Sequence, residues 1–268
     1  MSRSLAEVFD QARHEGRAAL IGYLPAGFPT AQESVELIRA MVDGGVDIVE
    51  VGLPYSDPLM DGPDIQAAVE QALGGGTTTD VVLDVVEQVS AHGITAVVMT
   101  YWNPIERYGV DRFATRLAQA GGHGVITPDL TPEEAAAWID ATGRNDLDRV
   151  FLVAPSSTDA RIDRVASVSS GFLYAASTMG VTGARAQVSS AAPELVERAR
   201  HATDLPVCVG LGVSTGDQAA EVAAYADGVI VGSAFVRRIL QAASPAEARE
   251  QVGLLAADLA EGVRRRPA

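Results

Sequence analysis

The sequence alternates eight times between a short apolar run and a longer stretch with helical periodicity. This alternation predicts a parallel sheet whose strands are joined by crossover helices. Eight such units can close on themselves as a (β/α)8, or TIM, barrel, and the 268 residues match the roughly 250 typical of that fold. The runs predicted as strands are 18–24, 46–51, 94–101, 124–127, 149–153, 172–176, 206–209 and 228–231.

An open doubly wound sheet is the alternative fold, but its first strand usually ends in a glycine fingerprint. Here the first predicted strand runs into a segment, 25–29, with proline at both ends. We therefore predict one barrel domain over residues 1–268. Residues 4–14 predict a helix that closes the bottom of the barrel. The second and sixth units are longer than the other units. We expect additional helices after strands two and eight. Capping boxes at Thr30 with Glu33, and at Thr131-Pro132 with Glu134, predict two helix starts.

The charged residues exclude several kinds of chemistry. All 20 basic residues are arginines, so no lysine is present to form a Schiff base. The four histidines stand far apart and Cys208 is the single cysteine, so no metal-ligand spacing appears. A net charge of -15 argues against nucleic acid or an anionic membrane as partner. One cysteine, and an N-terminus without an apolar block, indicate a cytoplasmic protein.

Glu50 is the first candidate catalytic residue. The period of a strand places Ile48 and Glu50 on one face and Val49 and Val51 on the other. Near the end of a barrel strand, a carboxylate facing the lumen loses water, and its pKa rises toward neutral pH. The alternative is a structural carboxylate that caps a neighbouring loop.

The loop after this strand contains Asp57, Asp61 and Asp64 between three prolines, Pro54, Pro58 and Pro63. A loop stiffened in this way can hold one carboxylate opposite Glu50, so that the pair divides the acid and base roles. The same residues also occur in ordinary surface turns.

A phosphate site is predicted after strands seven and eight, where barrels commonly bind phosphate. The candidates there are Gly212, Gly232 and Ser233, since glycines let backbone N–H groups approach an anion. The loop after strand six, which follows Tyr174 and contains Thr182 and Gly183, has the composition of a lid or of a long surface loop. Tyr101, Asn103 and Asp129 also fall just after strands three and four.

At these residues the chain strongly resembles the tryptophan synthase alpha subunit family over essentially its whole length. The motifs are the strand with Glu50, the Pro54-Tyr55-Ser56-Asp57-Pro58 turn, Asp61-Gly62-Pro63, Tyr174, the Gly180-Val181-Thr182-Gly183 loop and the two glycine pairs. One departure lies at 25–29, where many members carry Gly-Asp-Pro, and it affects the wall expected for the indole pocket.

The resemblance implies retro-aldol cleavage of indole-3-glycerol phosphate to indole and glyceraldehyde 3-phosphate. It implies Glu50 as general acid and base, and Asp61 as acceptor of the indole N–H. The substrate would contact Tyr101, Tyr174 and Thr182, and the phosphate would be bound by Gly183, Gly212, Gly232 and Ser233. Asp57 and Pro58 would contact a pyridoxal-dependent beta subunit in an alpha2beta2 tetramer, and this chain itself would hold no cofactor and no metal.

Two other functions are compatible with the residues alone. One is a different enzyme, either a stand-alone indole-3-glycerol phosphate lyase or a phosphate-binding isomerase. The other is a catalytically silent phosphate-binding barrel with a regulatory role.

Overall fold

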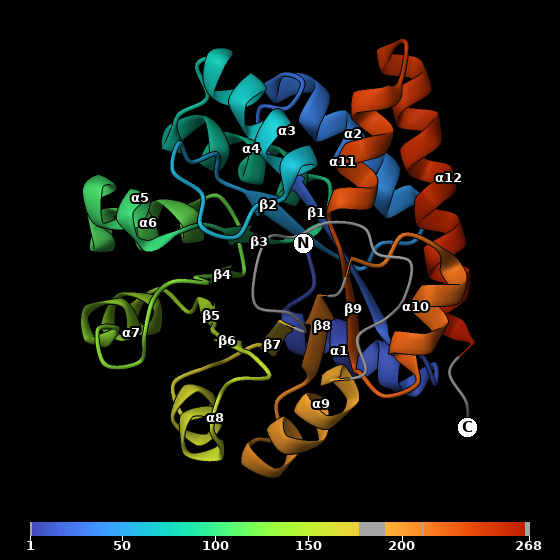
Figure 1. The fold of residues 1–268 in the computed structure, drawn as a ribbon. Helices are drawn as coiled ribbons and strands as arrows, with labels where there is room; N and C mark the ends of the chain where they lie inside the picture. The colour runs from blue at the N-terminus through green and yellow to red at the C-terminus, as the bar shows by residue number, and fades with distance from the viewer. Residues whose placement is uncertain (1, 177–190, 211, 266–268) are drawn as a thin grey trace.

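The computed structural model describes residues 2–176, 191–210 and 212–265. Helices surround a central ring of parallel strands in chain order (Figure 1). The strands are β1 (Ala19–Pro25), β2 (Ile48–Gly52), β3 (Thr95–Met99), β4 (Gly124–Ile126), β5 (Asp148–Val150), β6 (Leu152–Val153), β7 (Leu173–Ala176), β8 (Val207–Gly210) and β9 (Gly228–Val231). The helices are α1 (Leu5–His14), α2 (Ala31–Asp43), α3 (Pro63–Gly74), α4 (Thr79–Ala91), α5 (Trp102–Tyr108), α6 (Val110–Gln119), α7 (Ala136–Arg144), α8 (Asp159–Ala166), α9 (Ala191–Ala202), α10 (Gly216–Ala223), α11 (Ser233–Gln241) and α12 (Pro245–Arg264).

The strands form one sheet in the order β5-β4-β3-β2-β1-β9-β8-β7-β6. The two ends of this order, β5 and β6, are consecutive in the chain and separated only by Phe151. The first half of this predicted fifth strand pairs with β4 and the second half pairs with β7. The described strands therefore close into the predicted (β/α)8 barrel.

The additional helices lie where the sequence predicts them. Both α3 and α4 follow β2, and both α11 and α12 follow β9, whereas the pair α5 and α6 after β3 is not predicted. Thr30 caps α2 by accepting from the Glu33 N–H at 3.2 Å. The predicted start at Pro132 is wrong, because residues 131–134 form a separate turn and α7 begins only at Ala136.

Alternation along the strands divides the core into two parts. The larger part packs the outer strand faces, including Val49 and Val51, against the helices. The smaller part fills the lumen and is closed from below by α1, as predicted for residues 4–14. Its buried members are Leu5, Val8, Phe9, Ala12, Ala19, Ile21, Ile48, Val97, Ile126, Val150, Phe172, Cys208 and Ile230.

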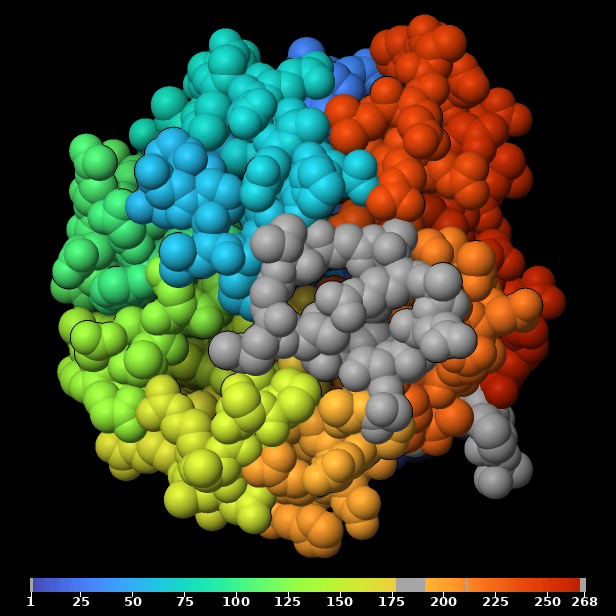
Figure 2. Space-filling view, in the orientation of Figure 1, coloured from blue at the N-terminus to red at the C-terminus, as the bar shows by residue number. Residues whose placement is uncertain are grey.

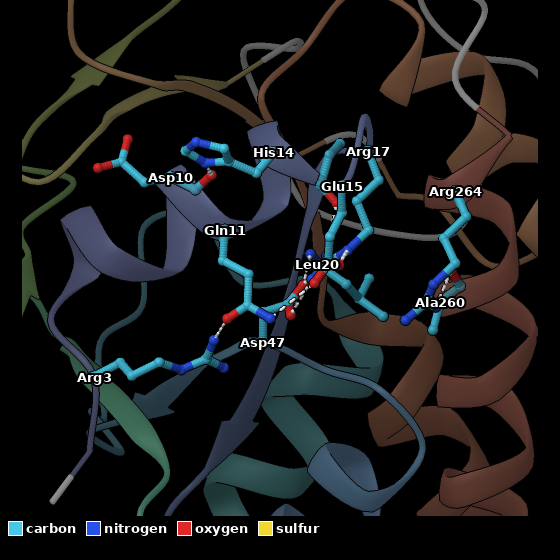
Figure 3. Close-up of polar contacts among 11 residues, drawn as sticks. Arg3, Asp10, Gln11, His14, Glu15, Arg17, Leu20, Asp47, Ala260 and Arg264 are labelled. Carbon is cyan, nitrogen blue, oxygen red and sulfur yellow. Dashed lines mark hydrogen bonds and ion pairs between the residues drawn. The ribbon is translucent and has the colours of Figure 1, made fainter.

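A buried ion pair lies at the N-terminal end of the strands (Figure 3). The two terminal nitrogens of Arg17 donate to the Asp47 carboxylate at 2.6 and 3.0 Å, and the Leu20 N–H donates to it at 2.8 Å. The Arg17 Nε donates in turn to Glu15 at 2.6 Å. Arg17 therefore has two acidic partners, Asp47 and Glu15, as a buried charge requires.

Candidate active site

Glu50 faces the lumen from the centre of β2, two residues before the last residue of the strand, Gly52. Its side chain points to the same side of the strand as that of Ile48, the lumen side, as the period of the strand predicts. Only 2% of the residue is exposed. Its Oε1 has no hydrogen-bond partner among the described residues. Burial therefore penalises the charged form and raises the pKa of Glu50 to about 8. At neutral pH this side chain is mostly a protonated acid that can donate a proton.

Two tyrosines stand beside Glu50 in the mouth of the barrel. Tyr23 is its register partner on β1, and Tyr174 is half-buried at the lumen side of β7. Burial, followed by the nearby Glu50 carboxyl, raises the pKa of Tyr174 above its ordinary value. Both hydroxyls therefore stay protonated at neutral pH and remain hydrogen-bond donors.

Asp61 lies in the segment between β2 and α3, and the hydroxyl of Tyr101 holds it there. This hydroxyl accepts from the backbone N–H groups of Leu59 and Met60 at 3.1 and 3.0 Å and donates to Asp61 Oδ1 at 3.3 Å. Burial raises the pKa of Asp61, and the Tyr101 hydrogen bond partly opposes that rise. Tyr101, for which the resemblance implies a substrate contact, anchors the loop that carries Asp61.

Further contacts tie the same segment to its neighbours. Asn103 donates to the Tyr55 hydroxyl at 2.8 Å, and Arg237 of α11 pairs with Asp64 at 2.6 Å. Figure 2 shows the segment, in blue, on the surface beside the green helices α5 and α6. Its outer part is exposed at Asp57 and at Leu59, a residue that is 70% exposed. Asp57 and Leu59 are therefore exposed in the described part of the chain.

Asp129, after β4, serves the backbone: its carboxylate accepts from the Trp102 N–H at 2.9 and 3.1 Å. This contact holds the start of α5, directly after Tyr101. Asp129, which the sequence places just after strand four, therefore contacts the preceding unit of the barrel.

The glycine loops after β8 and β9 lie side by side, because these strands pair in register through Gly210 and Ile230. Gly212 has a positive φ of 72°, a conformation that glycine adopts without strain. Gly232 precedes α11, and no described side chain caps the first turn of that helix. Ser233, the first residue of α11, is buried. Uncapped N–H groups at a helix start are suited to bind a phosphate.

Two predicted residues, Thr182 and Gly183, lie outside the described residues. Across the described ranges, no cluster of histidine, cysteine and acidic side chains has the makings of a metal site. None of the helices in those ranges has both the length and the apolar character needed to cross a membrane. The sequence analysis did not single out Tyr23, although the period of β1 places it on the same face as Ile21, and the register pairs it with Glu50.

Comparison with known proteins assigns the family. A family model described as tryptophan synthase alpha chain matches residues 9–264. The tryptophan synthase alpha chain of Acidothermus cellulolyticus is 58% identical over 265 residues, which is 99% of this chain and 98% of the relative. The chain belongs to the tryptophan synthase alpha chain family.

Solved structures agree with this assignment. A chain of Mycobacterium tuberculosis tryptophan synthase is 54% identical, with a TM-score of 0.92 over 98% of this chain and 99% of that one. Tryptophan synthase subunit alpha from Legionella pneumophila is 31% identical, with a TM-score of 0.88 over 98% of each chain. As a member of the family, the protein is a lyase of tryptophan biosynthesis that cleaves indole-3-glycerol phosphate, and its partner is the beta subunit.

Proposed function

We propose that Glu50 and Asp61 carry out the cleavage, with Glu50 as the acid and base and Asp61 as the acceptor of the indole N–H. The observation that carries the proposal is the buried Glu50 carboxyl, whose Oε1 has no described partner and whose pKa is raised to about 8. A proton carrier is most effective when its pKa lies near the working pH.

The steps balance without a lysine or a metal. The protonated Glu50 gives its proton to C3 of the indole, and Asp61 stabilises the positive charge that appears on the ring. The Glu50 carboxylate then takes the proton of the glycerol hydroxyl next to the ring. The carbon–carbon bond breaks, its electron pair returns to the ring, and the products are indole and an aldehyde. Glu50 is protonated again at the end, so the cycle needs no outside proton.

The proposal places the phosphate on neutral groups after β8 and β9, at Gly212, Gly232 and Ser233. Their support is the uncapped start of α11 and the adjacency of the two loops. Thr182 and Gly183 complete this part of the proposal, and Tyr174 and Tyr101 flank the indole. The absence of lysine fits a site in which backbone N–H groups meet the anion.

We also propose where the reaction takes place and which residues contact the beta subunit. Residues 1–268 act as one domain in the cytoplasm, and Asp57 and Pro58 contact the beta subunit within an alpha2beta2 tetramer. Pyridoxal phosphate is assigned to the beta subunit alone, since this chain has no lysine to form its Schiff base.

A steady-state assay of indole release tests the proposal, with and without added beta subunit. Asp61→Asn should lose most turnover with its KM nearly kept, and Gly212→Asp should raise KM sharply, because it sets a negative charge against the phosphate. A fully active Asp61→Asn enzyme would refute the assigned carboxylate role. An unchanged KM in Gly212→Asp would move the phosphate elsewhere, and no gain in rate with beta subunit would indicate a stand-alone lyase.

A further inference from the structure

An ion pair joins two helices that flank the candidate active site. Arg237 of α11 donates from Nε and from a terminal nitrogen to Asp64 Oδ2, at 3.1 and 2.6 Å. The two helices, α3 and α11, also pack against each other, and they lie side by side in Figure 1. The Arg237 side chain is 39% exposed and the Asp64 side chain 25% exposed. Two charge-assisted hydrogen bonds to a partly buried carboxylate therefore hold the helices in one arrangement.

The acidic end of this pair lies in the turn that carries Asp61. Asp64 is the second residue of α3 and comes three residues after Asp61. Gln66, in the same first turn, donates from Nε2 to the backbone carbonyl of Asp61 at 2.8 Å. Pro63, the first residue of the helix, has a fixed φ, so the chain between Asp61 and the helix has little freedom. A shift in the start of α3 would therefore move Asp61 with it.

The basic end of the pair lies on the helix whose start is assigned to the substrate phosphate. Ser233 is the first residue of α11, and Arg237 comes four residues later, about 6 Å along the axis and on the same face. Because one turn of a helix is rigid, a contact at Arg237 also fixes the position of the uncapped N–H groups at the helix start. The ion pair thus connects the element at the indole end of the site with the element at its phosphate end.

We propose that Asp64 and Arg237 are positioning residues of the cleavage reaction, whose ion pair sets the separation between Asp61 and the start of α11. The inference rests on the proposed roles of Asp61 and of the phosphate groups at α11. The substrate is held at both ends, so its reacting carbon atoms meet Glu50 correctly only when this separation is right. A misplacement of about 1 Å can lower a reaction rate by about 10²-fold.

The test compares kcat with KM for indole-3-glycerol phosphate cleavage, measured with saturating beta subunit. Asp64→Asn and Arg237→Gln each remove one charge of the pair. We expect kcat to fall about fivefold in each variant, the effect of one partly buried ion pair. KM should change less than about twofold, because the N–H groups at the start of α11 still bind the phosphate. Arg237→Lys keeps the charge and should retain more of kcat than Arg237→Gln.

Glu33→Gln is the matched control. Arg249 of α12 pairs with Glu33 of α2 at 2.8 Å, and the two side chains are 37% and 27% exposed. This pair therefore also joins two helices at nearly the same burial, but neither helix carries a residue of the proposed site. Thermal unfolding should show similar losses of stability for Glu33→Gln and Asp64→Asn, whereas only Asp64→Asn should lose kcat. If both variants lose stability and keep kcat, the pair is an ordinary helix contact and the proposal is overturned.

A double variant tests whether the two residues act as one unit. In Asp64→Asn with Arg237→Gln, kcat should be no lower than in the worse single variant, since both changes break the same contact. Multiplicative losses would overturn the proposal. A rise in KM larger than the fall in kcat for Arg237→Gln would also overturn it, by showing that Arg237 binds the phosphate directly.

The single variants of the site separate this proposal from the one on which it rests. The effects expected for Asp61→Asn and Gly212→Asp do not depend on the ion pair. If those two variants behave as expected while Asp64→Asn keeps its kcat, only the positioning role is wrong. Full activity of Asp61→Asn would instead refute the proposed function.

Discussion

Two carboxylates three residues apart have different surroundings: Asp47 directly precedes β2, and Glu50 is its central residue. Asp47, at the N-terminal end, receives both Arg17 nitrogens and the Leu20 N–H. Glu50, at the centre of β2, is buried, and its Oε1 has no hydrogen-bond partner among the described residues. The first arrangement fixes a charge and stabilises the fold. The second keeps a proton available, which teaches that burial alone does not make a carboxyl reactive; burial without a partner does.

The largest effect should come from removing the unpaired carboxyl. Glu50→Gln keeps the shape of the side chain but cannot exchange a proton, so we expect cleavage to fall about 10³-fold, within the range of general acid–base catalysis. Indole release and circular dichroism measure activity and fold. Glu70→Gln, on an exposed face of α3, is the control. Substantial cleavage by a folded Glu50→Gln protein would show that Glu50, like Asp47, is not needed for the reaction.

Breaking the paired end should affect stability rather than chemistry. Arg17→Met leaves Asp47, whose side chain is 11% exposed, without its counter-charge, and we expect the free energy of unfolding to fall by about 3 kcal/mol, the lower end of the range for a buried pair. Urea unfolding measures the loss, and kcat of the folded protein should be unchanged. The exposed pair of Arg13 with Asp10 offers a control, since Arg13→Met should cost less than about 1 kcal/mol. Equal losses from both variants would show that the buried pair is not special.

The pH dependence of stability should sharpen the comparison further. The Glu50 carboxyl ionises near its ordinary value of 4.5 in the unfolded chain and at about 8 in the folded one. Between these values the unfolded chain has released a proton that the folded protein keeps, so this group makes the free energy of unfolding fall as pH rises. In Glu50→Gln that contribution is lost.

We therefore expect the variant to gain stability over the unchanged protein as pH rises through this window, by on the order of a few kcal/mol. Urea unfolding at about pH 5 and about pH 8, in buffers of equal ionic strength, measures the difference in the free energy of unfolding between the variant and the unchanged protein. A constant difference at both pH values would mean that Glu50 titrates at its ordinary pKa in the folded protein.

The smallest expected effect concerns the glycine that makes room for Tyr23. A methyl group at Gly52 would displace the Tyr23 ring, so Gly52→Ala should cost about 1–3 kcal/mol of stability and part of the activity. Gly74→Ala is the control, because nothing lies within 4 Å of a β-carbon there. Thermal unfolding measures the change in stability, and the cleavage assay measures the change in activity. Equal stability and activity of the two variants would contradict the close contact between Gly52 and Tyr23.

The sequence predicts the barrel well because its signals are local. Strand period alone places Ile48 and Glu50 in the lumen, and Ser4 with Glu7 forms a capping box at the start of the predicted first helix. The predicted start of α7 is wrong because a local pattern of residue types can also form a turn. Thr131 and Glu134 have the residue types of a capping box, but their hydroxyl and carboxylate bond to each other in a separate turn.

The site is less predictable because its contacts join distant units. Nothing local to Asp61 indicates that a tyrosine forty residues later holds its loop. Tyr23 was missed because its neighbours are distant in sequence: Gly52 ends β2, and Gly232 follows β9. The resemblance identifies Glu50 and Asp61, but the pairing of Asp47 with Arg17 follows only from the three-dimensional arrangement.

The seam of the ring has a consequence for its rigidity. Around β2 the ladders are long, with five registered residue pairs to each neighbour, whereas β5 contributes three pairs and β6 two. Short ladders open more readily than long ones. Amide hydrogen exchange should therefore be fastest near Phe151 and slowest in β2. The reactive carboxyl of Glu50 thus belongs to the strand of the ring that local opening disturbs least.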